Sequence, residues 1–160
     1  MRKVIFLDFD GVINAQTGEW KTVDVPEFIG GCPHSTKMVQ TLNILIERSQ
    51  ADLVISSTWR LGTDIITLQQ VCTALGIKGR VIGKTDSLGK WTVRGNEIAK
   101  YIDENKEQLG YDYSWNYKSY VILDDDSDML LPQAANFVRI DNEVGITLED
   151  VEKAMQVLSR

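Results

Sequence analysis

The first residues of the chain that could do chemistry are two aspartates separated by one residue. Asp8 and Asp10 follow the apolar run Val4–Leu7, and Gly11 comes next. A spacing of two places both carboxylates on the same side of an extended backbone, where they repel each other unless a cation or a proton lies between them. Gly11 allows the chain to leave the strand through a backbone conformation that other residues avoid. The pattern indicates a site that holds a cation or shares a proton, and its simplest alternative is an ordinary Asp-Gly turn.

Two further polar clusters follow apolar segments later in the chain. The hydroxyl residues 56–58 come after residues 52–55, and the acidic run 124–128 comes after residues 119–123. Hydroxyls and backbone N–H groups suit the oxygens of a phosphate. If the strands are parallel, all three clusters lie along one edge of the sheet, where open α/β sheets bind ligands. The carboxylates then need a hard divalent cation, and Mg²⁺ is the usual choice beside phosphates.

Alternating strand and helix signals predict the elements that position these clusters. Apolar runs predict strands at residues 4–7, 52–55, 80–83, 119–123 and 135–140. Apolar residues at helical spacing predict helices at residues 35–49, 63–75 and 92–108, and a last helix capped by Thr147 and Asp150. This alternation predicts an α/β, three-layer Rossmann-like fold: a mostly parallel five-stranded sheet with helices on both faces.

Residues 15–33 do not follow this alternation. The segment contains three glycines and two prolines and has no sustained helical period. We expect a long loop or a small hairpin over the end of the first strand, and such segments often act as lids. The segment is too short to form a domain of its own. One domain is therefore expected over residues 1–160, without a large cap domain.

Composition bounds the class of protein. The chain has 160 residues, of which 43% are apolar and 25% charged, as in an ordinary globular domain. No run is apolar enough to cross a membrane, and no signal peptide is recognisable. The two cysteines form neither a disulfide framework nor a paired metal site, so a cytoplasmic protein is expected. The net charge of −6 argues against a broad basic surface for nucleic acid but leaves a local basic patch open.

The motifs together resemble those of the haloacid dehalogenase-like (HAD) hydrolase superfamily, whose members are mostly phosphatases. The first family motif, an apolar strand followed by Asp-x-Asp-Gly, is matched by Asp8, Asp10 and Gly11. The second, a strand ending in Ser or Thr, is matched by residues 53–56, and the fourth, a strand ending in an acidic pair, by residues 121–125. The stretches Asp-Gly-Val-Ile-Asn and Ser-Ser-Thr-Trp-Arg are similar to a small capless subgroup that includes HAD domains of RNA repair proteins.

The resemblance implies a catalytic role for several residues. Asp8 would be the nucleophile that forms an aspartyl-phosphate. Asp10 would protonate the leaving oxygen and then help to activate the hydrolytic water. Ser56 would bind the transferring phosphoryl group. Among nearby residues, Ser57 and Arg60 are expected to bind substrate, with a solvated Arg60 as the alternative.

The resemblance also implies a Mg²⁺ site, with Asp8, Asp10, Asp124 and Asp125 as the candidate residues. Asp8 and the backbone carbonyl of Asp10 would supply two ligands. Asp125, the second acid of the pair, is favoured as the third, and Asp124 would then orient the basic residue. Asp128 could contribute through a water molecule. A cation here would shield the attack of one anion on another.

The basic residue of the third family motif is left open by its variable spacing. Arg94 is expected at the start of a helix, where the family usually places this residue, and its guanidinium can grip phosphate with two hydrogen bonds. Lys84, Lys90 and Lys100 are the alternatives. Trp59, close to the second motif, either lines the substrate pocket or packs on the sheet.

These observations predict a Mg²⁺-dependent phosphatase that works through an aspartyl-phosphate on Asp8. Its partner is a phosphorylated substrate, either a small molecule or the end of a macromolecule. No membrane partner is expected, and the net charge does not point to nucleic acid. One alternative is a phospho-acceptor domain of the receiver type, but receivers place the acidic pair first. The other is a catalytically silent module that binds phosphate or nucleic-acid ends on the same fold.

Overall fold

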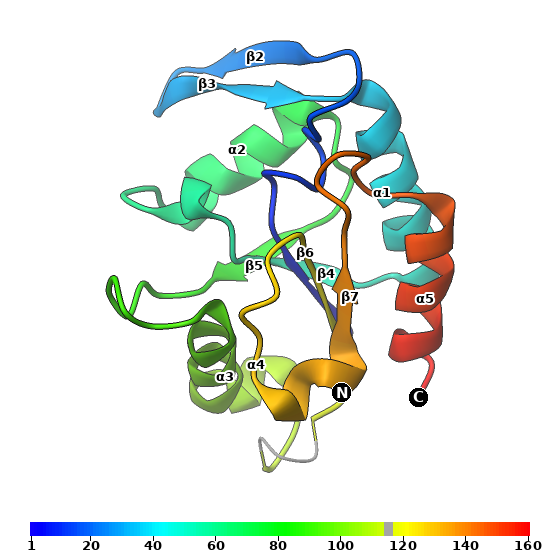
Figure 1. The fold of residues 1–160 in the computed structure, drawn as a ribbon. Helices are drawn as coiled ribbons and strands as arrows, with labels where there is room; N and C mark the ends of the chain where they lie inside the picture. Colours follow the sequence, from blue (N-terminus) through cyan, green and yellow to red (C-terminus); the bar gives the residue numbers. More distant parts are fainter. Residues whose placement is uncertain (114–116) are drawn as a thin grey trace.

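A five-stranded parallel sheet forms the centre of the computed structural model, which describes residues 1–113 and 117–160 (Figure 1). All neighbouring strands run parallel, in the order β5-β4-β1-β6-β7. The strands are β1 (Val4–Leu7), β4 (Asp52–Ile55), β5 (Val81–Lys84), β6 (Tyr120–Asp124) and β7 (Phe137–Arg139). The predicted fold class is confirmed.

The register of the central strands aligns their carboxyl ends. Leu7 of β1 pairs with Ile55 of β4 on one side and with Leu123 of β6 on the other. Beyond these pairs, the N–H of Asp8 donates to the Leu123 carbonyl at 3.0 Å, and the N–H of Ser56 donates to the Leu7 carbonyl at 3.0 Å. The residues that follow the paired positions therefore lie side by side at one edge of the sheet.

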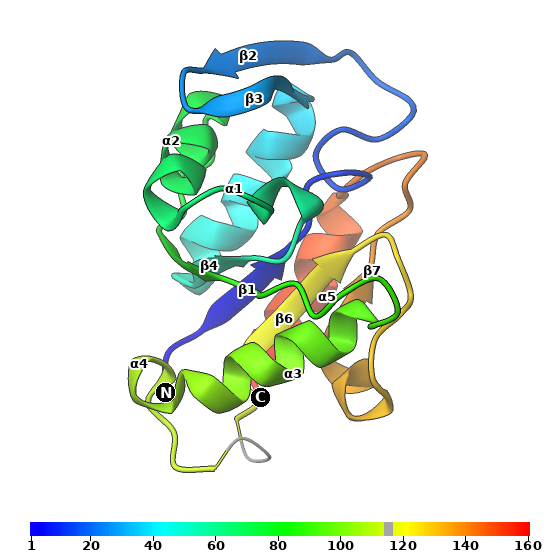
Figure 2. The ribbon, with the colours of Figure 1, turned by 90° about the vertical axis from the view of Figure 1, so that its left-hand side faces the viewer.

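Helices cover both faces of the sheet. On one face α1 (Thr36–Ser49), α2 (Ile65–Leu75) and α5 (Leu148–Leu158) share a core with alternate strand residues such as Ile5 and Leu7. On the other face α3 (Arg94–Glu104) packs on Val4 and Phe6. Figure 2 shows α3 in front of the sheet and α5 behind it. This two-sided burial explains why every residue of β1 is apolar.

Two elements differ from the sequence-based expectation. The helix expected over 92–108 begins at Arg94 and is interrupted at Asn105, after which a short α4 (Lys106–Leu109) follows. The Asn105 side chain donates to the Tyr101 carbonyl at 2.8 Å, and the same carbonyl accepts the backbone N–H of Asn105 at 3.1 Å. The strand expected over 135–140 is shorter, because residues 131–136 form a 3₁₀ helix before β7. The predicted capping box before α5 is present.

Residues 15–33 contain an antiparallel hairpin, which was one of the two predicted forms. Its strands are β2 (Lys21–Val25) and β3 (Phe28–His34). The hairpin lies over α2 in Figures 1 and 2 and buries Val25 and Cys32 in the main core. Within the described residues there is no large cap domain, and no helix there is both long and apolar enough to span a bilayer. Lid movement of the hairpin stays a prediction.

Candidate active site

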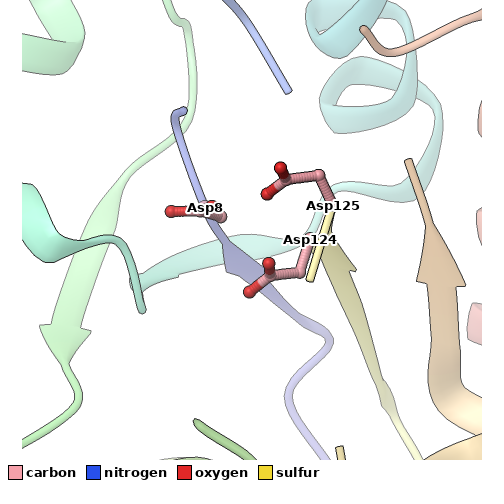
Figure 3. Close-up of side chains that lie close together, drawn as sticks. All are labelled: Asp8, Asp124 and Asp125. Atoms are coloured by element: carbon pink, nitrogen blue, oxygen red, sulfur yellow. The ribbon is translucent and has the colours of Figure 1, made fainter. Parts of the chain in front are cut away.

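The strand ends place three carboxylates in one cluster. Oxygens of Asp8, Asp124 and Asp125 all lie within 4.8 Å of one another (Figure 3). Asp8 directly follows the central strand β1, Asp124 is the last residue of its neighbour β6, and Asp125 follows it. Asp8 is 4% exposed and Asp124 is fully buried. We call these three residues the acid cluster.

Burial and mutual repulsion govern the ionisation of the acid cluster. Burial raises the pKa of Asp8, against the opposing effects of the Arg94 charge and of hydrogen bonds to its carboxylate. Burial raises the pKa of Asp124 to about 7, helped by the charge of Asp8 and opposed by Arg94. Two neighbouring carboxyls that resist ionisation together favour the binding of a cation.

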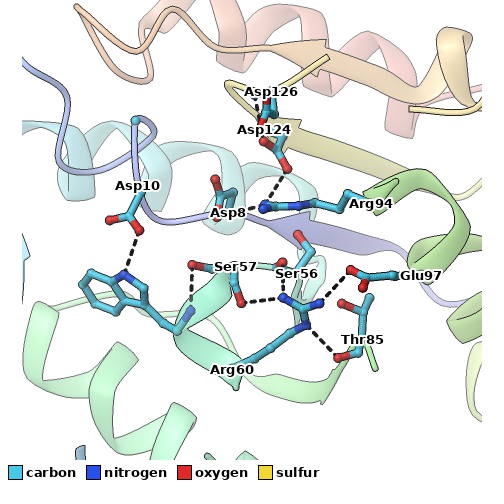
Figure 4. A network of polar contacts seen from close by, with 12 residues as sticks. Asp8, Asp10, Ser56, Ser57, Arg60, Thr85, Arg94, Glu97, Asp124 and Asp126 are labelled. Atoms are coloured by element: carbon cyan, nitrogen blue, oxygen red, sulfur yellow. Dashed lines mark hydrogen bonds and ion pairs between the residues drawn. The ribbon is translucent and has the colours of Figure 1, made fainter. Parts of the chain in front are cut away.

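Arg94 supplies the positive charge within this cluster. Its Nη1 lies 2.8 Å from Oδ2 of Asp124 and 3.1 Å from Oδ1 of Asp8 (Figure 4). Burial opposes its charged form, but the two acids outweigh this effect and raise the Arg94 pKa. Asp128 accepts the backbone N–H of Arg94 at 2.9 Å and fixes the start of α3. The structure therefore brings Arg94 to the nucleophile candidate.

The three alternative lysines bond elsewhere. Their partners are backbone carbonyls of residues 60 and 63 for Lys84, two exposed acids for Lys100, and the ring of Trp91 for Lys90. None of these contacts lies in the acid cluster, whereas both ion pairs of Arg94 do. Among the described residues, Arg94 is therefore the candidate best placed for the third family motif.

The acid cluster fits a hard divalent cation. It offers only oxygen donors, which such cations prefer. Both oxygens of Asp124 are already engaged, Oδ2 by Arg94 and Oδ1 by the N–H of Asp126 at 2.9 Å. Asp125 lies against the loop after β1, where a Cβ on Gly11 would come within 2.6 Å of its Cγ. Gly11 also has a φ of 77°, which other residues rarely adopt. Both the lack of space for a Cβ and this backbone conformation therefore favour glycine at position 11. Asp8 and Asp125 are thus the carboxylates best placed for a metal.

Asp10 lies at the mouth of the site and is exposed, unlike Asp8. Its Oδ2 accepts the indole N–H of Trp59 at 3.0 Å, and its Oδ1 accepts the side-chain amide of Asn14 at 2.8 Å. Its side chain is not part of the acid cluster. Any contribution of Asp10 to metal binding therefore rests on its backbone carbonyl, as the family resemblance implies.

The two serines after β4 occupy different environments. The Ser57 hydroxyl accepts the backbone N–H of Trp59 at 3.3 Å, and the Ser57 side chain is close enough to Asp8 to oppose the rise in the Asp8 pKa. The Ser56 hydroxyl is fully buried, has no partner among the described residues, and points toward Arg94 in Figure 4. Ser57 was expected to bind substrate, and the structure places it near the nucleophile candidate. The unpartnered hydroxyl of Ser56 is free to donate to a phosphoryl group.

Arg60 requires a correction, because it is neither solvated nor free to bind substrate. It is 4% exposed and forms an ion pair with Glu97 at 2.6 Å. Burial lowers its pKa, partly against the charge of Glu97. Its five N–H groups donate to Glu97 and to the backbone carbonyls of Ser56, Ser57, Thr85 and Asp86 (Figure 4). We reassign Arg60 from substrate binding to the support of the strand ends.

Sequence reasoning missed Glu97 and Asn14 and left the role of Trp59 open. Glu97 is a charged residue beside Ile98 on the buried stripe of α3, a position that calls for a buried cation. Asn14 follows Asp10 by four residues, a spacing at which a tight turn brings two polar side chains together. No local signal pointed to the bond between Trp59 and Asp10, which are 49 residues apart.

The fold agrees with a comparison against protein families. The family model described as "HAD domain in Swiss Army Knife RNA repair proteins" matches residues 4–151. The chain belongs to this family. The match confirms the HAD resemblance and covers every residue of the acid cluster together with Asp10 and Arg94. A search of the curated proteins found no match.

Proposed function

We propose that this HAD protein is a Mg²⁺-dependent phosphatase that forms an aspartyl-phosphate on Asp8. The observation that carries the proposal is the surroundings of Asp8 at the end of the central strand. A guanidinium nitrogen of Arg94 lies 3.1 Å from its carboxylate, and the nearby Ser57 side chain opposes the rise in the Asp8 pKa. Phosphoryl transfer depends on such positioned charges and hydrogen-bond donors.

Mg²⁺ is the cation that the acid cluster suits best. Asp8 and Asp125 would hold it, while Asp124 remains paired with Arg94. The ion would neutralise charge on the phosphoryl oxygens and on the attacking carboxylate. Arg94 adds a fixed positive charge beside the same oxygens. The buried hydroxyl of Ser56 and that of Ser57 are the neutral donors on the side of β4.

The chain's own residues account for the proton transfers. A carboxylate oxygen of Asp8 attacks phosphorus, the bond from phosphorus to the leaving oxygen breaks, and Asp10 gives that oxygen a proton. Water then attacks phosphorus and loses a proton to Asp10. The bond between Asp8 and phosphorus breaks, which releases inorganic phosphate and restores both carboxyl groups. Asp10 suits this role because it lies at the mouth of the site, outside the acid cluster.

The substrate proposal follows from the family and from the open site. The family takes its description from RNA repair proteins, and no large cap domain is present among the described residues. We therefore place the terminal phosphate of a nucleic acid first among substrates and a small phosphate ester second. Both cysteines, Cys32 and Cys72, are free and buried, which is compatible with the cytoplasmic location that we propose.

The test is phosphate release from an aryl phosphate and from oligonucleotides with a 5′- or 3′-phosphate, with Mg²⁺ and with a chelator. We expect Mg²⁺-dependent release, reduced on the order of a thousandfold or more in Asp8→Asn. Asp103→Asn, an exposed position on α3, is the matched control and should behave as wild type. Release that survives in Asp8→Asn would overturn the nucleophile assignment. Phosphate and Mg²⁺ binding without release would favour the silent binding module.

A further inference from the structure

We propose that Trp59 is a positioning residue for Asp10, and that the β2–β3 hairpin holds its indole in place. This inference rests on the proposed function, because it concerns the residue that exchanges protons with the leaving group and with water. The hairpin, which was expected to act as a lid, acts in this proposal as a support for the Trp59 ring. Three sets of contacts carry it: those on the Asp10 carboxylate, those on the Trp59 ring, and those at the ends of β3.

The Asp10 carboxylate is held at both oxygens. Trp59 Nε1 donates to Oδ2 at 3.0 Å, and Asn14 Nδ2 donates to Oδ1 at 2.8 Å. Each carboxylate oxygen has a second lone pair, so these bonds leave Asp10 able to give or take a proton toward the site. An exposed carboxylate without such donors would rotate freely about its side-chain bonds. The two donors therefore fix the direction in which Asp10 presents its proton.

The Trp59 ring is itself fixed by aromatic packing. Its centroid lies 4.9 Å from that of Phe9, in an edge-to-face arrangement, and 5.5 Å from that of Phe28. Phe9 is the residue between the two catalytic aspartates, and Phe28 begins β3 of the hairpin. None of this packing requires an indole N–H, because a phenyl ring packs in the same way. A Trp59→Phe substitution can therefore remove the hydrogen bond to Asp10 and keep the aromatic packing.

The second donor to Asp10 is also tied to the hairpin. Asn14 Nδ2 lies 3.4 Å from the carbonyl oxygen of Pro33, near the far end of β3. Its Oδ1 accepts the N–H of Gly11 at 2.9 Å, so the amide orientation is set. Strand β3 therefore meets the Trp59 donor through Phe28 and the Asn14 donor through Pro33. A hairpin connected in this way supports Asp10 from two sides.

The decisive experiment compares Trp59→Phe with wild type on two classes of substrate. A nitrophenyl phosphate has a leaving group that departs without a proton, whereas an alkyl phosphate needs the proton from Asp10. The quantity is kcat/KM, which reports only on steps up to the phosphorylation of Asp8. A positioned general acid contributes about 10²–10⁴-fold, so we expect kcat/KM to fall by roughly tenfold more for the alkyl ester than for the aryl ester.

The matched control is Trp20→Phe. The Trp20 indole donates to the carbonyl of Ala15 at 2.8 Å and not to the Asp10 carboxylate, whose donors are Trp59 and Asn14. This variant also loses an indole N–H near the hairpin. We expect its kcat/KM, relative to that of the wild type, to be the same for the alkyl ester and for the aryl ester. Equal losses of kcat/KM on both esters in Trp59→Phe would overturn the proposal in favour of a structural role. A larger loss on the alkyl ester in Trp20→Phe would do the same.

A double variant tests whether Trp59 acts through Asp10. Asp10→Asn by itself should reduce alkyl ester hydrolysis. In that background we expect Trp59→Phe to change kcat/KM by less than about twofold, because residues that act through one group are not additive. Independent losses that multiply would contradict the positioning role.

An indole N–H signal tests the contact without any turnover. In a ¹H–¹⁵N spectrum, the signal lost in Trp59→Phe should shift on Asp10→Asn, while the signal lost in Trp20→Phe should stay in place. An unmoved Trp59 signal would refute the contact. If the wild type hydrolyses neither ester nor the terminal phosphate of an oligonucleotide, the proposed phosphatase function fails, and this spectrum still decides whether Trp59 holds Asp10.

Discussion

Two arginines lie near the strand ends of this protein, Arg60 buried and Arg94 partly exposed, and their surroundings differ sharply. Arg60, after β4, faces one carboxylate and four carbonyls, and all five of its N–H groups are used. Arg94, at the start of α3, faces Asp8 and Asp124 through a single nitrogen. The first arrangement balances its charge, whereas the second leaves negative charge in excess.

The difference between the two surroundings distinguishes an arginine that supports the fold from one that is placed for catalysis. Around Arg60 every donor has an acceptor, which is the condition for a buried polar network to stabilise a fold. Around Arg94 the pKa of Asp124 is raised to about 7 and the Ser56 hydroxyl has no partner among the described residues. Strongly perturbed groups of this kind mark functional sites more often than structural ones. A buried arginine beside a site is therefore judged by whether its donors are already engaged.

The largest effect that we expect from this comparison is the loss of stability in Arg60→Ala. Removing the guanidinium leaves Glu97 buried without its partner, which costs about 3–5 kcal/mol of unfolding free energy. Urea denaturation measures this change. The double variant Arg60→Met/Glu97→Met should recover only the part of the loss that comes from the unpaired Glu97 charge, because the four carbonyls that Arg60 served stay without their donor. A stable Arg60→Ala with a raised KM alone would return Arg60 to the substrate-binding set.

Arg94→Ala should act on turnover instead. We expect kcat/KM for an aryl phosphate to fall by roughly a hundredfold, the scale of losing one donor to the transition-state charge. Arg94→Lys should retain part of the rate, because it keeps the charge but loses the planar fork. The control is Lys84→Ala, whose ammonium bonds to carbonyls outside the acid cluster. A loss in Lys84→Ala as large as in Arg94→Ala would contradict the assignment.

The smallest expected effect concerns pH and metal. The pKa of Asp124 rises from 3.8 in the unfolded chain to about 7 in the folded protein, with burial as the main cause. Between these values the folded protein binds more protons than the unfolded chain, so metal-free stability falls as pH rises through this window. Each kcal/mol lost lowers Tm by about 2–4 °C. We expect thermal unfolding to show a lower Tm at pH 8 than at pH 5.

In the proposed site Mg²⁺ binds the ionised acid cluster, so added Mg²⁺ should reverse this loss. We expect added Mg²⁺ to raise Tm more at pH 8 than at pH 5, and Asp125→Asn to weaken the response. Asp103→Asn serves as the control for a change of one surface charge. If Mg²⁺ raised Tm equally at both pH values, metal binding would not depend on the ionisation of these carboxyls, which would contradict the prediction.

Much of the site could be predicted because its parts follow buried strands directly. Four apolar residues before Asp8 predicted β1, and the acidic run after residue 123 predicted the end of β6. Parallel pairing then brings the two together without further information. The environment of Arg60 was not predictable, since its partners Thr85 and Glu97 lie 25 and 37 residues away.

The sequence by itself determined the family, the parallel sheet and the meeting of Asp8 with the acidic pair, because these follow from short local patterns repeated at strand ends. Only the tertiary structure decided which basic residue joins them, which serine hydroxyl is left without a partner among the described residues, and which side chain holds Asp10. Trp59 and Asp10 illustrate the reason, since their bond joins residues 49 positions apart. Such a contact depends on how the loops and the hairpin pack, and no local periodicity encodes it.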